Sequence, residues 1–147
     1  HQYLLEHHSE FDFIWSSPPC QTHSSFRFNI GVRYRGVKPV YPDMTLYEEI
    51  VFLQHHSDAL WVVENVRPYY EPLIEATQID RHLYWSNFEL PTTVPKVEKL
   101  REAQIPQLQE LHGYDLSKYK LSNKRQVLRN CVYAPTGQAI LEAALNA

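Results

Sequence analysis

The chain has 147 residues, of which 44% are hydrophobic and 21% are charged, and it carries a formal net charge of −3. These values exclude a disordered chain and a generally basic nucleic-acid binder, and the length predicts about one domain. No apolar run reaches membrane-spanning length, and the two cysteines, Cys20 and Cys131, do not make a disulfide framework. We therefore expect a globular protein of a reducing cytoplasm.

Apolar runs and turn residues predict an alternation of helices and strands along the chain. The expected helices cover residues 1–9, 45–56, 96–112 with a kink at Pro106, and 136–146. The expected strands cover residues 11–17, 59–66 and 82–90. Thr45 and Glu48 form a capping-box pattern at the start of the second helix. Residues 21–42 show no sustained period and are expected to form a long functional loop. The alternation predicts an α/β fold.

Two segments of the chain are basic and contain no acidic residue. The first spans residues 21–42 and the second spans residues 117–130. Their basic residues are Arg27, Arg33, Arg35 and Lys38, and then Lys118, Lys120, Lys124, Arg125 and Arg129. In a chain of negative net charge, this distribution indicates a local contact with a polyanion, although two solvated loops remain the simpler reading of each segment alone.

Cys20 is the first candidate for chemistry. It follows the apolar strand 11–17, and Pro18 and Pro19 must end that strand because proline cannot donate to a sheet. In open α/β sheets, ligands bind beyond the carboxyl ends of strands, so a thiol held there is a candidate nucleophile. The local sequence leaves a structural cysteine equally open, since free cysteines are often buried.

Glu64 ends the second predicted strand as Cys20 follows the first. If the two strands are parallel neighbours, both side chains emerge at the same edge of the sheet. A carboxyl group after Trp61-Val62-Val63 is expected to be partly desolvated, which favours its protonated form and suits a general acid. The alternative is a strand-end glutamate that caps a neighbouring turn.

These residues belong to four short motifs that occur in the order seen in DNA (cytosine-5) methyltransferases. The motifs are Ser17-Pro18-Pro19-Cys20-Gln21, Glu64-Asn65-Val66, Arg81-His82-Leu83-Tyr84 and Asn130-Cys131-Val132. The chain resembles the portion of that family from its Pro-Cys motif to its last helix. The resemblance implies part of a Rossmann-like class I methyltransferase sheet. Residues 1–90 would be the catalytic half of the core, 91–122 a short target-recognition region, and 123–147 a C-terminal motif and helix.

The same resemblance implies a mechanism. The thiolate of Cys20 would attack carbon 6 of a cytosine flipped out of double-stranded DNA. Glu64 would protonate the ring nitrogen at position 3, and carbon 5 would take a methyl group from S-adenosylmethionine. Asn65 would hold the Pro-Cys loop in place. Arg81 or His82 would contact the base or order that loop; the family usually has two arginines here, one residue apart.

Further residues are implied to bind the cofactor and the DNA. Pro19, Asn130 and Val132 would form one wall of the cofactor pocket, although Arg129 stands where the family usually has glycine. The implied DNA contacts are Gln21, Ser24, Arg27, Arg33, Arg35, Lys38 and Arg125. No histidine pairs with cysteine at zinc-site spacing, so no metal is expected.

The glycine-rich segment that binds the cofactor in the family is missing, and the chain has only four glycines. We therefore expect a C-terminal fragment, or one subunit of a split enzyme, that is inactive without an N-terminal half or partner subunit. Its expected location is the cytoplasm or nucleoid of a bacterium, as a bacterial or phage-encoded protein. Two alternatives stay open: a non-catalytic DNA-binding or accessory module derived from this family, and an unrelated thiol hydrolase with His23 as base.

Overall fold

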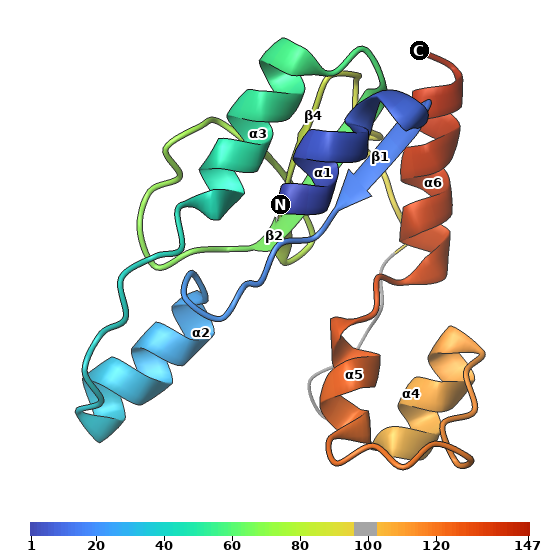
Figure 1. Cartoon of the computed structure of the whole chain (residues 1–147). Coiled ribbons are helices and arrows are strands. Elements are labelled where there is room, and N and C mark those ends of the chain that lie inside the picture. The colour runs from blue at the N-terminus through green and yellow to red at the C-terminus, as the bar shows by residue number, and fades with distance from the viewer. Residues whose placement is uncertain (96–102) are drawn as a thin grey trace. The chain divides into compact units, whose positions relative to one another are not determined.

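The computed structural model describes residues 1–95 and 103–147 of the chain (Figure 1). It divides the chain into two compact units, His1–Leu90 and Pro91–Asn146. Unit 1 holds a four-stranded sheet and three α-helices, whereas unit 2, over its described residues, holds three α-helices. Within the described residues, no helix has the length and apolarity needed to cross a membrane.

The sheet of unit 1 is mixed, and it confirms the expected α/β class. Its strands are β1 (Phe13–Ser16), β2 (Leu60–Val66), β3 (Thr77–Ile79) and β4 (His82–Ser86), in the order β1-β2-β4-β3. β1 pairs with β2 in parallel, with Ser16 opposite Val63, and the other two pairings are antiparallel. The carboxyl ends of β1 and β2 therefore lie at the same edge of the sheet.

One face of this sheet is covered by helices. α1 (Gln2–His7) continues into a short 3-10 turn, η1 (His8–Glu10), and α3 (Thr45–His56) connects the first two strands in sequence (Figure 1). Leu46, Ile50 and Leu53 of α3 pack against the strand residues of the core, which are Ile14, Trp61, Val63, Leu83 and Trp85. Because side chains alternate along a strand, Val62 and Glu64 point to the face opposite α3.

The helix over 45–56 is confirmed, but its predicted capping box is wrong. The residue that precedes the helix is Met44, and no side chain caps the helix from that position. The Asp43 carboxylate instead accepts a hydrogen bond from the backbone N–H of Thr45, at 3.1 Å. An aspartate two residues earlier therefore takes the role that the sequence pattern assigned to Thr45.

The long loop expected over 21–42 is also wrong in part, because its first half is helical. α2 (Ser25–Arg27) runs directly into a π-helical segment, η2 (Phe28–Tyr34). Ser24 begins this helix, and its hydroxyl accepts from the backbone N–H of Arg27 at 3.3 Å. Phe28 stacks on Tyr69, with ring centroids 4.2 Å apart, so tertiary packing supports a helix that the sequence period does not reveal.

Unit 2 contains α4 (Ile105–His112), α5 (Lys124–Asn130) and α6 (Ala134–Leu145). The kink expected at Pro106 is wrong, because this proline lies in the first turn of α4, where its missing N–H costs no hydrogen bond. The part of the expected helix over 96–102 lies outside the described residues. α5 was not expected, and α6 confirms the predicted C-terminal helix with a start two residues earlier.

Candidate active site

The loop after β1 brings Cys20 to the carboxyl edge of the sheet. Pro18 and Pro19 end the strand, and Cys20 begins a turn in which its carbonyl oxygen accepts from the N–H groups of His23 and Ser24, both at 3.1 Å. The Cys20 side chain is half-buried. The thiol is therefore neither sealed in the core nor free on an unstructured loop.

Glu64 lies in β2 at the same edge, and it is buried, with 8% of its surface exposed. The hydroxyl of Ser17 donates to Oε2 of Glu64 at 2.9 Å, so the Pro-Cys loop contacts this carboxylate directly. Nδ1 of His82 lies 3.5 Å from Oε1 of Glu64. Glu64 is thus held between the Cys20 loop and the first residue of β4.

Asn65, the next residue of β2, fixes the loop from a second side. Its Nδ2 donates to the carbonyl oxygen of Pro18 at 3.1 Å, and its Oδ1 accepts from the N–H of Val66 at 2.9 Å. Asn65 is 2% exposed, so both bonds are shielded from water. The loop-holding contact that the resemblance implies for Asn65 is present, and it ties the peptide two residues before Cys20 to the sheet.

The thiol of Cys20 is held in its neutral form in this structure. Burial raises the pKa of Cys20 above its ordinary value; the backbone of the turn opposes this shift in part, and the nearby Glu64 carboxylate adds a smaller rise. Formation of the Cys20 thiolate therefore has to offset the cost of burying its charge.

The two residues expected to assist catalysis occupy different positions. His82 begins β4 beside Glu64, and burial lowers the pKa of its imidazole, while the charge of Glu64 opposes that shift. Arg81 is exposed in the tight turn between β3 and β4, next to Asp80, which has a positive φ of 52°. His82 contacts the Glu64 carboxylate through its Nδ1.

His23 has a structural role that the sequence did not predict. Its side chain is 1% exposed, and its ring Nδ1 is hydrogen-bonded to the hydroxyl of Tyr70. Its carbonyl oxygen accepts from the N–H of Tyr69 at 3.0 Å. In the hydrolase alternative, His23 would serve as the base for Cys20, whereas the partner of its Nδ1 here is Tyr70. His23 therefore anchors the loop to the segment after β2.

Most of the residues expected to contact DNA lie in the segment 21–42 that follows Cys20, and two of them, Arg27 and Arg33, lie in its helical part. Gln21, Arg27, Arg33, Arg35 and Lys38 are exposed in unit 1, and Ser24 is partly buried at the start of α2. One guanidinium nitrogen of Arg27 donates to the carbonyl oxygen of Gln21 at 3.2 Å. Arg125 lies in α5 of unit 2, where its Nε donates to the carbonyl oxygen of Ala103 at 3.1 Å. The structure thus places six of these seven residues in unit 1.

The residues expected to bind the cofactor are divided between the two units. Pro19 follows β1 in unit 1, whereas Asn130 ends α5 and Val132 precedes α6 in unit 2. Neither unit alone therefore forms the cofactor wall that the resemblance implies. The described residues also contain no group of three or more histidines, cysteines, aspartates or glutamates that could hold a metal ion.

Comparisons of the chain with protein-family models, with curated proteins and with solved structures gave no significant match. The functional assignment therefore depends on the arrangement of Cys20, Glu64, Asn65 and His82 at one edge of the sheet.

The buried histidines predict a stability that depends on pH. Burial lowers the pKa of both His23 and His82 in the folded chain, so the unfolded chain binds more protons as the pH falls below about 6.5. Stability is therefore fully present above that pH and decreases below it, by up to about 1.4 kcal/mol per histidine for each pH unit. Urea unfolding at several pH values measures this decrease.

Two variants test whether the decrease in stability below pH 6.5 comes from a buried histidine. We expect His23→Gln to flatten the pH profile, because it removes one titrating group. His55→Gln, at the exposed end of α3, is the matched control and is expected to leave the slope unchanged. Equal stability of the unchanged chain on both sides of pH 6.5 would contradict the account of these two sites.

Proposed function

We propose that the chain carries the base-activating chemistry of a DNA (cytosine-5) methyltransferase, with Cys20 as nucleophile and Glu64 as proton donor. One observation carries the proposal. The parallel register of β1 and β2 brings the Cys20 loop to the strand that bears Glu64, and the Ser17 hydroxyl bonds the loop to that carboxylate. Addition to a pyrimidine ring requires a nucleophile and an acid. Here the loop that carries the nucleophile is hydrogen-bonded to the acid through Ser17.

The fold of unit 1 is compatible with this assignment. Its first two strands are parallel and are connected through α3, and an antiparallel β4 follows at the far side of β2. We propose that this sheet is part of a Rossmann-like class I methyltransferase sheet. The site then lies beyond the carboxyl ends of β1 and β2, where open α/β sheets bind ligands.

The first chemical step uses groups of unit 1 alone. The Cys20 thiolate forms a bond to carbon 6 of a flipped cytosine, and the electrons of the 5,6 double bond move into the ring. Glu64 gives its proton to the ring nitrogen at position 3, so the adduct forms without net charge on the base. Carbon 5 becomes nucleophilic and takes a proton from water. Loss of the proton that carbon 5 originally carried, return of the proton on the ring nitrogen to Glu64 and expulsion of the Cys20 thiolate then restore the ring.

The surrounding residues position these two groups. Ser17 holds one carboxylate oxygen of Glu64, and His82 lies against the other. Since burial lowers the pKa of His82, its imidazole is neutral near pH 7. Asn65 holds the carbonyl of Pro18, which limits the positions that the Cys20 thiol can take.

The methyl donor in this proposal is S-adenosylmethionine, but the described residues do not fit a complete site for it. The four glycines are Gly31, Gly36, Gly113 and Gly137, and none follows a strand of the sheet. The three residues implied to contact the donor are split between the units. We therefore derive no transfer step, and we propose that an N-terminal half or a partner subunit supplies the rest of the donor site.

Double-stranded DNA is the proposed substrate. The segment that follows Cys20 contributes four basic residues and no acid over residues 21–42. Tyr34 and Tyr41 on the same segment are largely exposed, at 82% and 79%. Basic side chains interleaved with exposed aromatic rings are typical of a surface that contacts phosphates and bases.

The experiment that tests the proposal needs no methyl donor. Reversible addition of Cys20 to carbon 6 activates carbon 5, so the intact protein should release tritium into water from duplex DNA labelled at carbon 5 of cytosine. Release above the rate with DNA alone is the expected result. No release, from protein that binds the same duplex, would contradict the enzyme and favour the accessory DNA-binding module, which the incomplete donor site also permits.

A further inference from the structure

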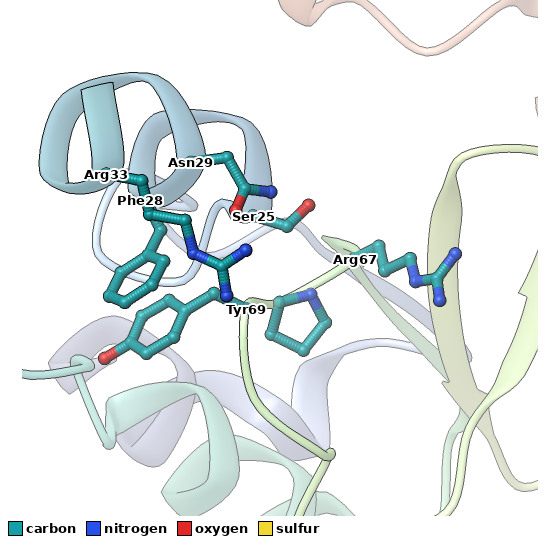
Figure 2. Close-up of a pocket in the computed structure, with 7 residues that line it drawn as sticks. Ser25, Phe28, Asn29, Arg33, Arg67 and Tyr69 are labelled. Carbon is teal, nitrogen blue, oxygen red and sulfur yellow. The ribbon is translucent and has the colours of Figure 1, made fainter.

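A pocket of about 350 Å3 lies between the helix after Cys20 and the segment after β2, both in unit 1. Its lining residues are Ser25, Phe28, Asn29, Arg33, Arg67, Pro68 and Tyr69. Figure 2 shows Arg33 beside the rings of Phe28 and Tyr69, whereas the side chain of Arg67, on the other wall, extends away from Arg33. Neither the helix nor the segment forms this pocket alone.

The two walls are joined by specific contacts. The N–H of Ser25 donates to the carbonyl oxygen of Arg67 at 3.2 Å, and Ser24 forms a β-bridge with Pro68. The Phe28 and Tyr69 rings stack almost in parallel, with an interplanar angle of 8°. The carbon Cζ of Arg33 lies 5.9 Å from the centroid of the Phe28 ring, within the range of a cation–π contact. The pocket is thus formed where the helix made of α2 and η2 packs against the segment after β2.

The chemistry of the lining selects an anion. The lining residues carry two guanidinium groups, one amide and two hydroxyls, and none of the seven has a carboxylate side chain. Arginine presents a planar fork of donors that matches the oxygens of a phosphate group. Arg33 and Arg67 are both exposed, so their side chains are free to reorient toward a shared ligand.

We propose that this pocket binds one backbone phosphate of the DNA, held jointly by Arg33 and Arg67. The assignment rests on the proposed function and adds two features to it: a DNA contact outside the basic segment, at Arg67, and a single phosphate shared by two chain segments. Because that phosphate bridges the helix and the segment after β2, DNA binding stabilises the docked helix and, through it, the turn that begins at Cys20.

Binding of the intact protein to a duplex, measured by fluorescence anisotropy over a range of salt concentrations, tests this sharing. We expect Arg33→Gln and Arg67→Gln each to weaken binding about tenfold near 0.1 M salt. The double variant should lose much less affinity than the product of the two single losses, because the first substitution already removes the contact with the shared phosphate. The salt slope should fall by about 0.9 in the double variant, the value for one phosphate.

Arg35→Gln is the matched control, because Arg35 is an exposed arginine of the same segment that does not line the pocket. In the double variant with Arg33→Gln, the two single losses of affinity should multiply, since the two residues do not share a phosphate. Arg33→Lys should recover most of the salt slope but only part of the affinity, because lysine keeps the charge and loses the planar fork. Unchanged melting temperatures establish that the variants are folded.

Three outcomes would overturn the shared phosphate. The first is that the affinity losses of Arg33→Gln and Arg67→Gln multiply fully in the double variant. The second is that Arg67→Gln binds DNA as tightly as the unchanged protein, and the third is that the unchanged protein binds no duplex. If inorganic phosphate at constant ionic strength binds in calorimetry and requires Arg33, while DNA affinity does not, the pocket serves a small phosphorylated ligand instead. A failure at Arg67 with intact tritium release would reject this pocket and leave the proposed reaction unaffected.

Discussion

Replacement of Cys20 by alanine is expected to reduce tritium release from carbon 5 of cytosine by about 10⁴-fold or more. The thiolate of Cys20 is the group that forms the bond to carbon 6, and alanine leaves no nucleophile at that position. Because the Cys20 side chain is only half-buried, the substitution leaves a small gap and should not unfold the sheet. Rate constants at saturating DNA, compared with those of the unchanged protein, give the result.

The second cysteine of the chain provides the matched control. Cys131 follows α5 in unit 2, and its Sγ contacts the carbonyl oxygen of Val127 at 3.4 Å. Burial raises the pKa of both thiols, so the raised pKa does not distinguish the two residues. Cys131→Ala should retain the exchange rate. If Cys131→Ala lost the exchange and Cys20→Ala retained it, Cys20 would not be the nucleophile.

Replacement of Glu64 by glutamine is expected to slow the same exchange by about 10²- to 10⁴-fold. Glutamine retains the shape of the side chain and an oxygen that accepts from Ser17, but it has no acidic proton for the ring nitrogen. The adduct then forms with uncompensated negative charge on the base. The measurement is the exchange rate of folded protein at saturating DNA, with affinity for the duplex determined separately.

A second buried glutamate, on the helix α3 that packs on the sheet, serves as its control. Glu49 of α3 is 5% exposed, and its Oε2 accepts from the hydroxyl of Ser16 at 2.7 Å, as Glu64 accepts from Ser17. The two serines are neighbours, so the two carboxylates lie on opposite faces of the sheet. Glu49→Gln is expected to alter stability and to retain the exchange rate. Equal rate losses in the two variants would indicate a structural role for Glu64.

The sequence predicted the elements that position Cys20 and Glu64 because both signals are local and strong. The apolar run that ends at Pro18-Pro19 fixes where β1 stops, and Trp61-Val62-Val63 marks a buried strand. The prediction that a parallel pairing would bring the two ends together is confirmed by the register of β1 and β2. The hydrogen bond from Asn65 to Pro18 also follows the arrangement that the motif order implied.

The features that the sequence missed depend on contacts between distant residues. η2 contains Gly31 and two β-branched residues and has no clear helical period, and its position is fixed by the stack of Phe28 on Tyr69. β3 has three residues, and it pairs through a turn whose positive φ falls on Asp80 rather than on a glycine. Arg67 lay outside both basic segments, so charge patterning could not assign it to a phosphate site.

His23 shows the same limit for a single side chain. In sequence it stands among five polar residues that follow Cys20, a context that predicts an exposed position. In the structure it is buried against Tyr70, a residue 47 positions away. A polar residue can be buried when a distant partner binds one of its polar atoms, as Tyr70 does for Nδ1 of His23, and one sequence does not reveal that partner.

The most direct test of the account is whether the protein becomes covalently attached to the cytosine of its DNA substrate. The chain, together with the N-terminal half or partner subunit that completes the donor site, is incubated with S-adenosylmethionine and a duplex that carries 5-fluorocytosine, whose fluorine cannot leave carbon 5 as a proton does. The complex is then denatured and digested, and the modified peptide is identified by mass spectrometry. The account predicts a cytosine adduct on the sulfur of Cys20 that Cys20→Ala abolishes. A covalent complex that persists in Cys20→Ala, or one attached at Cys131, would contradict it.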